Sequence, residues 1–348
     1  MRAYIISLNF NPGHVSHMVA YYRQYEELGY ESWMYIDKGF TEFIPADCRY
    51  IVYGMNKPEE CSLAVFMFPS YKNLLEIKSL KCQKDCKIVY LFHEPLDKYS
   101  TYREAGFSWL KMLKLRVVNM VNVLTVRWSD LIFIPSMKAI NYYESNHLYK
   151  NPNYHYLPLL YDDEQTKKTG KIERKFFSYI GTVAPDHSFD EYMAFVKWAI
   201  LNNQLPDFNF LIATRNKVNR NTDTIILINT RRLTIFDGVP LTDVQINNFF
   251  SESIAIWNAY TRTTQSGVLA KSFMFGTPAI VLKKNLSEFV EDGKEVIAIN
   301  NNTDYHEIAD ALVRITKSHA AFSASCRTRF LNTFYYKSFN QQVKDVLK

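Results

Sequence analysis

The sequence predicts an α/β protein with two domains, each built on a parallel β-sheet with crossover helices. Short apolar runs alternate with longer helix-like runs from the first residue onward, a pattern typical of strand–helix–strand units. The chain has 348 residues, 47% of them hydrophobic, which is more than one ordinary core serves and enough to bury two. Residues 161–175 are polar and lack an apolar period, so we expect them to link the two domains.

The first series of runs occupies residues 1–160, the predicted N-terminal domain. It opens with a strand at residues 4–8, a turn at residues 9–13 and a helix at residues 14–28 that Gly29 ends. Further strands are expected at residues 31–36, 63–68, 87–92 and 130–134. A polar or proline-containing loop follows each strand, at the carboxyl edge where parallel sheets bind their ligands.

The second series occupies residues 176–329, the predicted C-terminal domain. Its strands are expected at residues 176–181, 208–213, 233–236, 254–258 and 279–282, and its helices near residues 189–201, 243–251 and 305–317. An aromatic-rich tail, residues 330–348, follows and is the predicted terminal helix. This order of elements predicts two Rossmann-like domains that face each other across a cleft.

Composition and short motifs narrow the class of protein. Charged residues make up 22% of the chain, which argues against global disorder. The formal net charge of +6 is compatible with phosphate-bearing partners, but no zinc-finger, RNP or helix-turn-helix pattern supports nucleic acid. The five cysteines are scattered, and Cys82 and Cys86 have no second Cys or His pair at ligand spacing. We therefore expect reduced thiols and no metal.

A turn of small residues from Thr264 through Ser266 and Gly267 to Val268 is the most informative motif. It opens an amphipathic helix that stops at Gly276. Such a turn points backbone N–H groups and the positive end of a helix dipole at one spot, which suits a phosphate or diphosphate. The motif therefore predicts a nucleotide-diphosphate pocket in the second domain.

Polar residues also follow two strands of the first domain. Gly13 lets the backbone approach a ligand at the first strand's end, although a tight turn also uses glycine for its φ angle. His14 could act as a general base or cap the next helix. His93 and Glu94 end a buried strand, and Glu94 could accept a proton or cap a helix. We take His14, His93 and Glu94 as candidate catalytic residues.

The order of these motifs resembles the donor-sugar half of glycosyltransferases with the GT-B fold, particularly glycosyltransferase family 4. In that family a helix, a Gly-x-Pro stop, a strand and a Glu-x-x-x-Asp-Gly loop follow one another, as Gly276 to Pro278, residues 279–282 and Glu288 to Gly293 do here. Residues 128–136 and 153–158 are similar to the family elements that close the first domain. The resemblance implies sugar transfer from a nucleotide diphosphate to a glycan or lipid-linked glycan, in bacterial surface polysaccharide synthesis.

The resemblance also implies roles for individual residues. His93 matches a family histidine that lines the donor-sugar pocket, and Glu94 would be the base if transfer inverts the anomeric centre. Glu288 would hold the sugar or ribose, and the loop with Gly13 would lie near the acceptor and the donor phosphates. The C-terminal tail would cross back to the first domain. No metal is required if the helix N-terminus and basic side chains offset the leaving diphosphate.

The chain departs from the family pattern at two points. The family carries a Glu, seven residues and a second Glu, where Thr263 and Lys271 stand here. The Arg and Lys that follow the first strand of the family's second domain are replaced by a run that begins with Gly181 and Thr182. Other cations could compensate the diphosphate, namely Arg215, Lys217, Arg262 and Lys271. The losses imply an altered donor, a divergent inverting enzyme, or a catalytically inactive GT-B subunit that binds a glycan or a partner enzyme.

Localisation is predicted from the absence of two signals. No signal-peptide cleavage region is present, and no apolar stretch reaches the roughly 18 residues of a spanning helix. Residues 107–127 interleave large apolar side chains with Lys111, Lys114, Arg116 and Arg127. Such a helix can lie on an anionic bilayer surface, or it can be a core helix with a solvated basic face. We expect a cytoplasmic protein, and peripheral attachment to the inner face of the membrane stays open.

Overall fold

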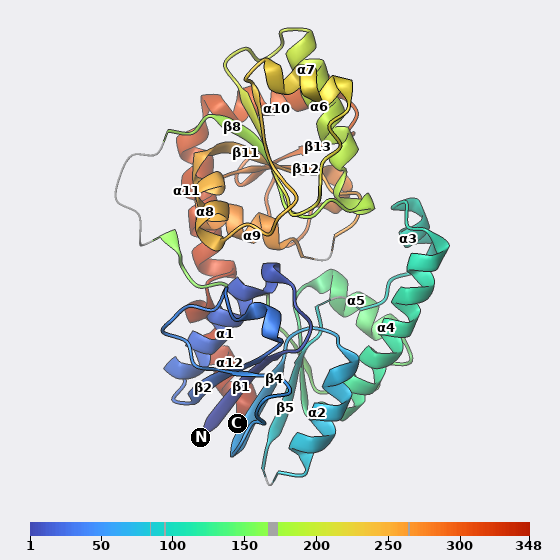
Figure 1. The fold of residues 1–348 in the computed structure, drawn as a ribbon, viewed down its shortest axis with the longest axis vertical. Coiled ribbons are helices and arrows are strands. Elements are labelled where there is room, and N and C mark those ends of the chain that lie inside the picture. The colour runs from blue at the N-terminus through green and yellow to red at the C-terminus, as the bar shows by residue number, and fades with distance from the viewer. Residues whose placement is uncertain (84, 94, 166–172, 264) are drawn as a thin grey trace. The chain divides into compact units, whose positions relative to one another are not determined.

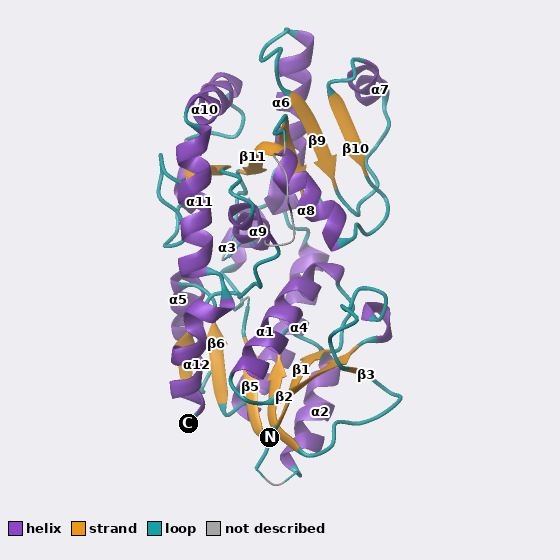
Figure 2. Ribbon diagram, turned by 90° about the vertical axis from the view of Figure 1, so that its left-hand side faces the viewer, coloured by secondary structure: helices purple, strands orange, loops and turns teal. Residues whose placement is uncertain are grey.

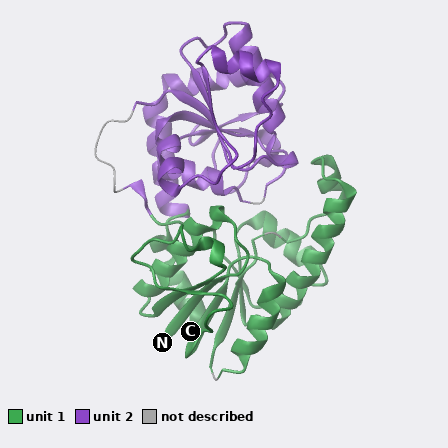
Figure 3. Cartoon of the chain, viewed as in Figure 1, with its two compact units in different colours: residues 1–162, 334–348 green, residues 163–333 purple. Residues whose placement is uncertain are grey.

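The structure is a computed structural model of residues 1–348 that describes all of them except residues 84, 94, 166–172 and 264. The chain divides into two compact units (Figure 3): unit 1 comprises Met1–Asp162 and Phe334–Lys348, and unit 2 comprises Asp163–Thr333. Each unit contains a parallel sheet and helices (Figure 1), so the predicted α/β class is confirmed. Residues 166–172 of the predicted linker lie outside the described residues.

The sheet of unit 1 has the strands β1 (Arg2–Ser7), β2 (Glu31–Ile36), β3 (Tyr50–Val52), β4 (Cys61–Phe66), β5 (Lys87–Leu91), β6 (Leu131–Ile134) and β7 (Tyr154–Tyr156). Their order is β3-β2-β1-β4-β5-β6-β7, and every neighbouring pair is parallel. From β1 the chain adds β2 and β3 toward one edge of the sheet, and β4 then pairs with the other side of β1. This reversal creates a topological switch point between β1 and β4.

The helices of unit 1 cover both faces of this sheet (Figure 2). They are α1 (Val15–Glu27), α2 (Tyr71–Lys81), α3 (Tyr99–Glu104), α4 (Trp109–Trp128), α5 (Met137–Ser145) and α12 (Asn340–Leu347). Ser70, Ser108 and Ser136 accept hydrogen bonds from first-turn N–H groups of α2, α4 and α5, which satisfies donors that a helix start leaves unpaired. The C-terminal α12 packs on α1, because Val343 is buried in the same core and the Gln24 amide donates to Asn340 Oδ1 over 3.2 Å.

Unit 2 repeats the same design. Its strands are β8 (Phe176–Ile180), β9 (Asn209–Ala213), β10 (Leu233–Phe236), β11 (Ser253–Asn258), β12 (Ala279–Leu282) and β13 (Val296–Ile299), and its helices are α6 (Phe189–Leu201), α7 (Thr222–Asn229), α8 (Asp243–Glu252), α9 (Gly267–Met274), α10 (Tyr305–Lys317) and α11 (His319–Thr333). The sheet order is β10-β9-β8-β11-β12-β13, so its switch point lies between β8 and β11. Most of the strands and helices predicted in this half occur within one or two residues of their predicted bounds.

The helix that follows the predicted small-residue turn is α9, and the chain leaves it through Gly276. The φ of Gly276 is +64°, and an added Cβ would lie 2.4 Å from Ser323 Oγ in α11. Glycine is therefore needed here both for the left-handed turn and for the close approach of α11. The next residue, Thr277, donates from Oγ1 to the Phe250 carbonyl over 2.7 Å. Together these contacts position α9 against the sheet of unit 2.

Candidate functional site

Unit 1 has a pocket of about 360 Å³ at the carboxyl edge of its sheet. The loops after β1 and β4, the end of β5 and one residue of α4 supply its lining, which is Asn9, Phe10, Asn11, His14, Phe68, Pro69, Tyr90, Phe92, His93 and Asn122. The pocket thus lies at the switch point, where sheets of this topology bind ligands. It contains both His14 and His93, which the sequence predicted at separate strand ends. Glu94, the third predicted catalytic residue, lies outside the described residues.

The two histidines contact the same aromatic ring in this pocket. His14 stacks on Phe68 with ring centroids 3.3 Å apart and an interplanar angle of 14°. His93 meets Phe68 edge-on, with centroids 6.5 Å apart and an angle of 86°. Phe68 therefore fixes the positions of both imidazoles, and the sequence offered no signal for it beyond its place at the end of a strand.

Asn11 orients His14 through hydrogen bonds on both sides of its amide. Asn11 Oδ1 accepts from the Gly13 N–H at 3.3 Å, which leaves Nδ2 to donate to His14 Nε2 at 3.0 Å. The neutral imidazole of His14 then carries its proton on Nδ1. His14 is the N-cap residue of α1, but its side chain makes no capping hydrogen bond to this helix. The φ of Gly13 is not positive, so its backbone conformation does not require glycine.

Unit 2 places four predicted residues together at its own switch point, namely Gly181, Ser266, Gly267 and Val268. Gly181 follows β8 with a φ of +136°, and an added Cβ would lie 3.3 Å from Val268 Cγ2 and 3.9 Å from Tyr260 Oη. The end of β8, the loop after β11 and the start of α9 therefore meet here. Ser266 is the N-cap of α9 and accepts from the Leu269 N–H at 3.3 Å. Gly267 begins this helix, while Thr264 of the same turn lies outside the described residues.

The loop after β11 adds a charged cluster to this edge. Arg262 has a side chain only 5% exposed, and its Nη1 lies 3.9 Å from Asp186 Oδ2. The backbone carbonyl of Asp186 accepts from the Thr261 N–H at 2.9 Å, which holds the loop in place. His187 stacks on Tyr260 with centroids 4.3 Å apart and contacts the Thr182 carbonyl through Nδ1 at 2.6 Å. Arg262 is thus a nearly buried guanidinium close to the carboxylate of Asp186.

Lys271, another candidate for the diphosphate, has carboxylate partners within unit 2. Its Nζ lies 2.8 Å from Asp243 Oδ1 and 3.5 Å from Glu164 Oε2. Burial opposes the charge of this ammonium, but the two carboxylates prevail and raise the pKa of Lys271 above its ordinary value. These two ion pairs neutralise the Lys271 ammonium within the protein, without a bound ligand. Arg215 and Lys217 differ from the buried Lys271 in that both are exposed, in the loop after β9.

Two hydrogen bonds tie neighbouring loops to the same edge. The Val183 N–H donates to Asn216 Oδ1 over 2.9 Å, which holds the loop of Arg215 beside that of Gly181 and Thr182. Asn285 Nδ2 donates to the Tyr260 carbonyl over 2.5 Å. The second bond anchors the loop after β12, in which Glu288 is exposed. The loop that contains Glu288 therefore lies next to Tyr260, which in turn lies beside Gly181.

Sequence reasoning missed several residues that build these sites. They are Phe68 and Asn122 in unit 1 and Asp186, Asn258 and Tyr260 in unit 2. Asn258 had a usable signal, because it is a polar residue at the end of an apolar strand, and it donates from Nδ2 to Ser266 Oγ over 2.9 Å. Asn122 lies in the middle of a long helix, and only the fold brings it to Tyr90, whose hydroxyl donates to it over 2.9 Å.

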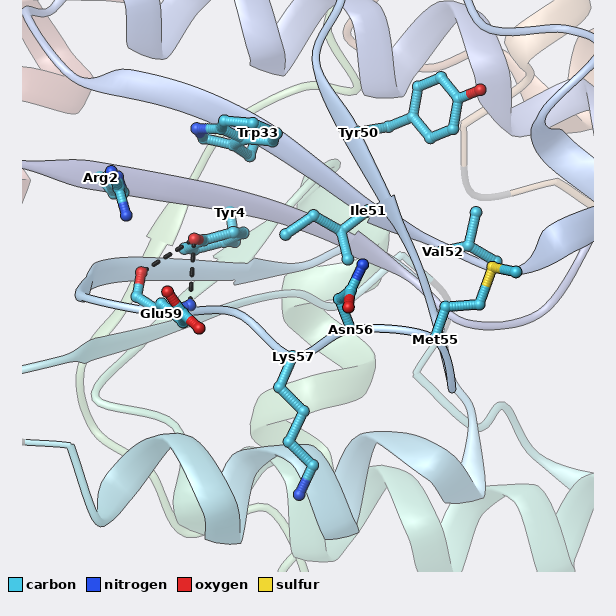
Figure 4. Close-up of a pocket in the computed structure, with 10 residues that line it drawn as sticks. All are labelled: Arg2, Tyr4, Trp33, Tyr50, Ile51, Val52, Met55, Asn56, Lys57 and Glu59. Atoms are coloured by element: carbon cyan, nitrogen blue, oxygen red, sulfur yellow. Dashed lines mark hydrogen bonds between the residues drawn. The ribbon is translucent and has the colours of Figure 1, made fainter.

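A second hollow in unit 1, of about 510 Å³, has a different position (Figure 4). It opens beside the amino-terminal parts of β1 and β2 and beside β3, with Arg2, Tyr4 and Trp33 in its lining. Arg2 already pairs with Glu31 at 2.9 Å, and the Tyr4 hydroxyl donates to the Glu59 carbonyl over 2.9 Å. Because substrates of such sheets bind at the carboxyl edge, we do not assign this hollow to the predicted reaction.

Among the described residues, no three His, Cys, Asp or Glu side chains form a group that could hold a metal ion. The described helices also include none that is both long and apolar enough to span a bilayer.

Comparison with known proteins identifies the fold through solved structures. No protein-family model matches the chain, and no curated protein matches its sequence. HepE from Anabaena, solved in complex with UDP and glucose, is 14% identical with a TM-score of 0.71, over 100% of this chain and 99% of that chain. The chain has the GT-B fold. Sucrose-phosphate synthase from Thermosynechococcus elongatus is 12% identical with a TM-score of 0.68, over 99% of this chain and 98% of that chain.

WaaG, a glycosyltransferase involved in lipopolysaccharide biosynthesis, shares the fold as well. It is 10% identical with a TM-score of 0.66, over 100% of both chains. These neighbours are glycosyltransferases, and HepE was crystallised with UDP and with UDP-glucose. The predicted fold class is thus confirmed, while assignment to glycosyltransferase family 4 stays a prediction.

Proposed function

We propose that this chain is a nucleotide-sugar-dependent glycosyltransferase. It transfers a hexosyl or related sugar from a nucleotide-diphosphate donor to a glycan or lipid-linked glycan, in the cytoplasmic steps of bacterial surface polysaccharide synthesis. The observation that carries this proposal is the switch point of unit 2, where Gly181, Val268 and Tyr260 converge at the start of α9. A strand end without a side chain beside a helix N-terminus suits a diphosphate. The nucleotide complexes of HepE, a structural neighbour, support the same ligand class.

In this proposal unit 2 binds the donor. The first N–H groups of α9 hydrogen-bond the diphosphate, and the helix dipole adds to that attraction. Arg262 is the best placed cation, because its side chain is nearly buried at this edge and its attraction to a phosphate is weakly screened. Arg215 and Lys217 supply further positive charge from the loop after β9. Glu288 contacts a hydroxyl of the sugar or ribose, and charge neutralisation by these groups replaces a metal.

Unit 1 binds the acceptor in the pocket at its own switch point. Asn11 occupies the lone pair of His14 Nε2, so His14 is not the first proton acceptor. His93 takes the proton from the attacking hydroxyl, with Glu94 beside it in the sequence. Phe68, which both imidazoles contact, belongs to the lining of the same pocket.

The experiment that tests the function is a binding screen followed by a transfer assay on the full chain. Thermal unfolding is measured with UDP-, GDP- and ADP-linked sugars, and a donor at a hundred times its Kd is expected to add about 2.7 kcal/mol of stability. Donors that bind are then incubated with cell-envelope glycans, and release of the nucleoside diphosphate is followed. A chain that no nucleotide sugar stabilises would contradict the proposal.

A second candidate is a catalytically inactive GT-B subunit that binds a glycan or a partner enzyme. The pairing of Lys271 with Asp243 and Glu164 favours it, since the carboxylate that holds the ribose in the family is replaced here by an internally neutralised cation. The same screen separates the candidates: the inactive subunit binds glycan without nucleotide-dependent turnover.

A further inference from the structure

The hollow beside the amino-terminal parts of β1 and β2 lies where a covering helix is missing. Parallel strands of one sheet are usually joined through a helix that packs on a face of the sheet. The connection from β3 to β4, residues 53–60, contains no helix. This part of the sheet face therefore stays open, and a hollow of about 510 Å³ remains there. Its volume is typical of ligand sites, which span roughly 300–1,000 Å³.

Side chains from three neighbouring strands form the floor of the hollow. Tyr4 of β1 and Trp33 of β2 are partners in the parallel register, so their side chains lie on the same face of the sheet. Ile51 of β3 lines the hollow beside them. The Trp33 Nε1–H donates to Glu31 Oε1 over 3.2 Å, and the Arg49 guanidinium lies 5.7 Å from the centre of the indole ring. These contacts fix the half-buried indole in place before any ligand binds.

Polar groups lie across the hollow from the aromatic rings. Figure 4 shows Trp33 and Tyr50 along one side and Asn56 and Glu59 along the other. Tyr50, Asn56 and Glu59 are exposed. The loop that carries Asn56 and Glu59 is anchored, because the Tyr4 hydroxyl donates to the Glu59 carbonyl over 2.9 Å and accepts from the Glu59 N–H over 3.2 Å. The rim is therefore preformed, with hydrogen-bond donors and acceptors facing aromatic surface.

The charges around the hollow nearly cancel. Arg2 Nε lies 2.9 Å from Glu31 Oε2, and Arg2 Nη1 lies 3.4 Å from Glu60 Oε2. The other charged residues of the lining are Lys57 and Glu59, one of each sign. The lining thus has no excess of positive charge to select a phosphate and no excess of negative charge to select a cation. Its composition suits a neutral ligand with both apolar faces and hydrogen-bonding groups.

We propose that this hollow is a second carbohydrate site, which binds a neutral oligosaccharide. The C–H face of a sugar ring packs on an aromatic ring, and its hydroxyl groups exchange hydrogen bonds with amides and carboxylates. Trp33 and Tyr50 would take the apolar faces, and Asn56 and Glu59 would take the hydroxyl groups. A protein partner fits less well, because the cores of protein interfaces are depleted of glutamate and lysine. Binding here requires no nucleotide and no residue of unit 2.

The hollow and the switch-point pocket of unit 1 lie toward opposite ends of the same strand. Tyr4 lines the hollow, and Asn9, five residues further along the chain, lines the pocket. Five extended residues span about 17 Å, a length that a few linked sugars cover. A glycan held in the hollow would raise the local concentration of its free end at the pocket. This consequence rests on the proposed transfer reaction, whereas the carbohydrate site itself does not.

A binding experiment on the full chain without nucleotide tests the proposal. A printed array presents neutral hexasaccharides of glucose, mannose and galactose together with their uronic-acid counterparts, and calorimetry then gives the Kd of each neutral sugar that binds. The variants are Tyr50→Ala, Asn56→Ala and Trp33→Leu, the last of which keeps an apolar side chain against the core. The matched controls, Tyr71→Ala and Trp109→Leu, remove exposed aromatic rings of unit 1 outside the hollow. Thermal unfolding and light scattering report the Tm and the oligomeric state of each variant.

We expect the wild type and both controls to bind a neutral hexasaccharide more tightly than its uronic-acid counterpart. Trp33→Leu and Tyr50→Ala should each raise the Kd about tenfold or more, because aromatic anchors dominate such sites. Asn56→Ala should raise it about threefold, through one lost hydrogen bond. The Tm of the Tyr50 and Asn56 variants should be unchanged, since both side chains are exposed.

Three results would overturn the proposal. The first is that no neutral sugar binds, and the second is that the Kd is equal in the wild type and all three variants. The third is that His93→Ala loses the sugar while Tyr50→Ala retains it, which would assign the sugar to the switch-point pocket. A Tyr50 variant that dissociates a dimer at an unchanged sugar Kd would assign the hollow to a second copy. Sugar binding without any transfer would support this site and contradict only the proposed reaction.

Discussion

His14 lies flat against Phe68 in the unit 1 pocket, with ring centroids 3.3 Å apart. This contact joins the loop after β1 to the loop after β4 across the switch point of the sheet. His93 approaches the same ring from the end of β5. Phe68 therefore links two histidines that are 79 positions apart in the sequence, counting from 14 to 93, and the pocket depends on all three loops.

We expect His93→Ala to lower the rate of transfer about a hundredfold or more, because a missing acid or base group typically costs that factor. Binding of the donor to unit 2 should be unchanged. Transfer is measured under saturating donor, and donor Kd by calorimetry. His155→Ala is the matched control, since His155 lies on the edge strand β7, away from the pocket lining, and its side chain contacts Asn153. Full turnover by the His93 variant would move the proton acceptor elsewhere.

Gly181→Ala should weaken nucleotide binding. The new Cβ would press on Val268 at the start of α9 and strain a backbone with φ of +136°. Gly238→Ala is the control, because Gly238 also has positive φ (+83°) but no atom lies within 4 Å of an added Cβ. Both variants should lose about 1 kcal/mol or more of stability in urea. Only the first should raise the Kd for UDP, and an equal Kd for both would place the nucleotide away from Gly181.

Gly267→Asp should abolish nucleotide binding while the fold survives. A carboxylate in the first turn of α9 repels a diphosphate at the same position, although it interacts favourably with the helix dipole. Thr222→Asp places the same charge at the first residue of α7 and serves as the control. Calorimetry with UDP measures the first effect and thermal unfolding the second. Retained UDP affinity in a well-folded Gly267 variant would show that the pocket lies elsewhere.

Lys271→Met should destabilise unit 2 by about 2 kcal/mol, because it leaves Asp243 and Glu164 without their ammonium. This figure is below that for a fully buried pair, since both carboxylates are partly exposed. Lys197→Met breaks the exposed pair with Asp223 and should cost less than about 1 kcal/mol. Urea denaturation measures both. If UDP affinity falls in folded Lys271→Met protein, the ammonium also serves the ligand.

Cys61 and Cys86 should form a disulfide under mild oxidation with diamide. Their sulfur atoms lie 2.8 Å apart, and all five cysteines are free in this structure. The hydrogen bond between the two thiols lowers the pKa of Cys86, which favours its reactive thiolate. Mass spectrometry should find the loss of two hydrogens and a peptide that joins the two residues. Cys82→Ser should leave this product unchanged, whereas Cys61→Ser should remove it.

Much of the fold could be predicted because parallel strands buried on both faces leave a strong apolar signal. The strands at residues 31–36, 233–236 and 279–282 were predicted with their observed bounds. The strands β3 and β7 were missed, since each has three residues and so short a run carries no periodic pattern. The cysteine pair was missed for another reason: Cys61 and Cys86 meet only because β4 and β5 are neighbours in the sheet.

Local sequence patterns predict where polar residues end apolar strands, and hence that Gly13, His14, His93 and Gly181 stand at carboxyl edges. The reason is local, because strand and turn signals depend on a few adjacent residues. Which of these strand ends meet depends instead on the order of the strands in each sheet. Strand order placed Phe68 beside His14 and Tyr260 beside Gly181, and packing turned an apolar face of α4 outward. Such contacts depend on long-range pairing, which no local pattern encodes.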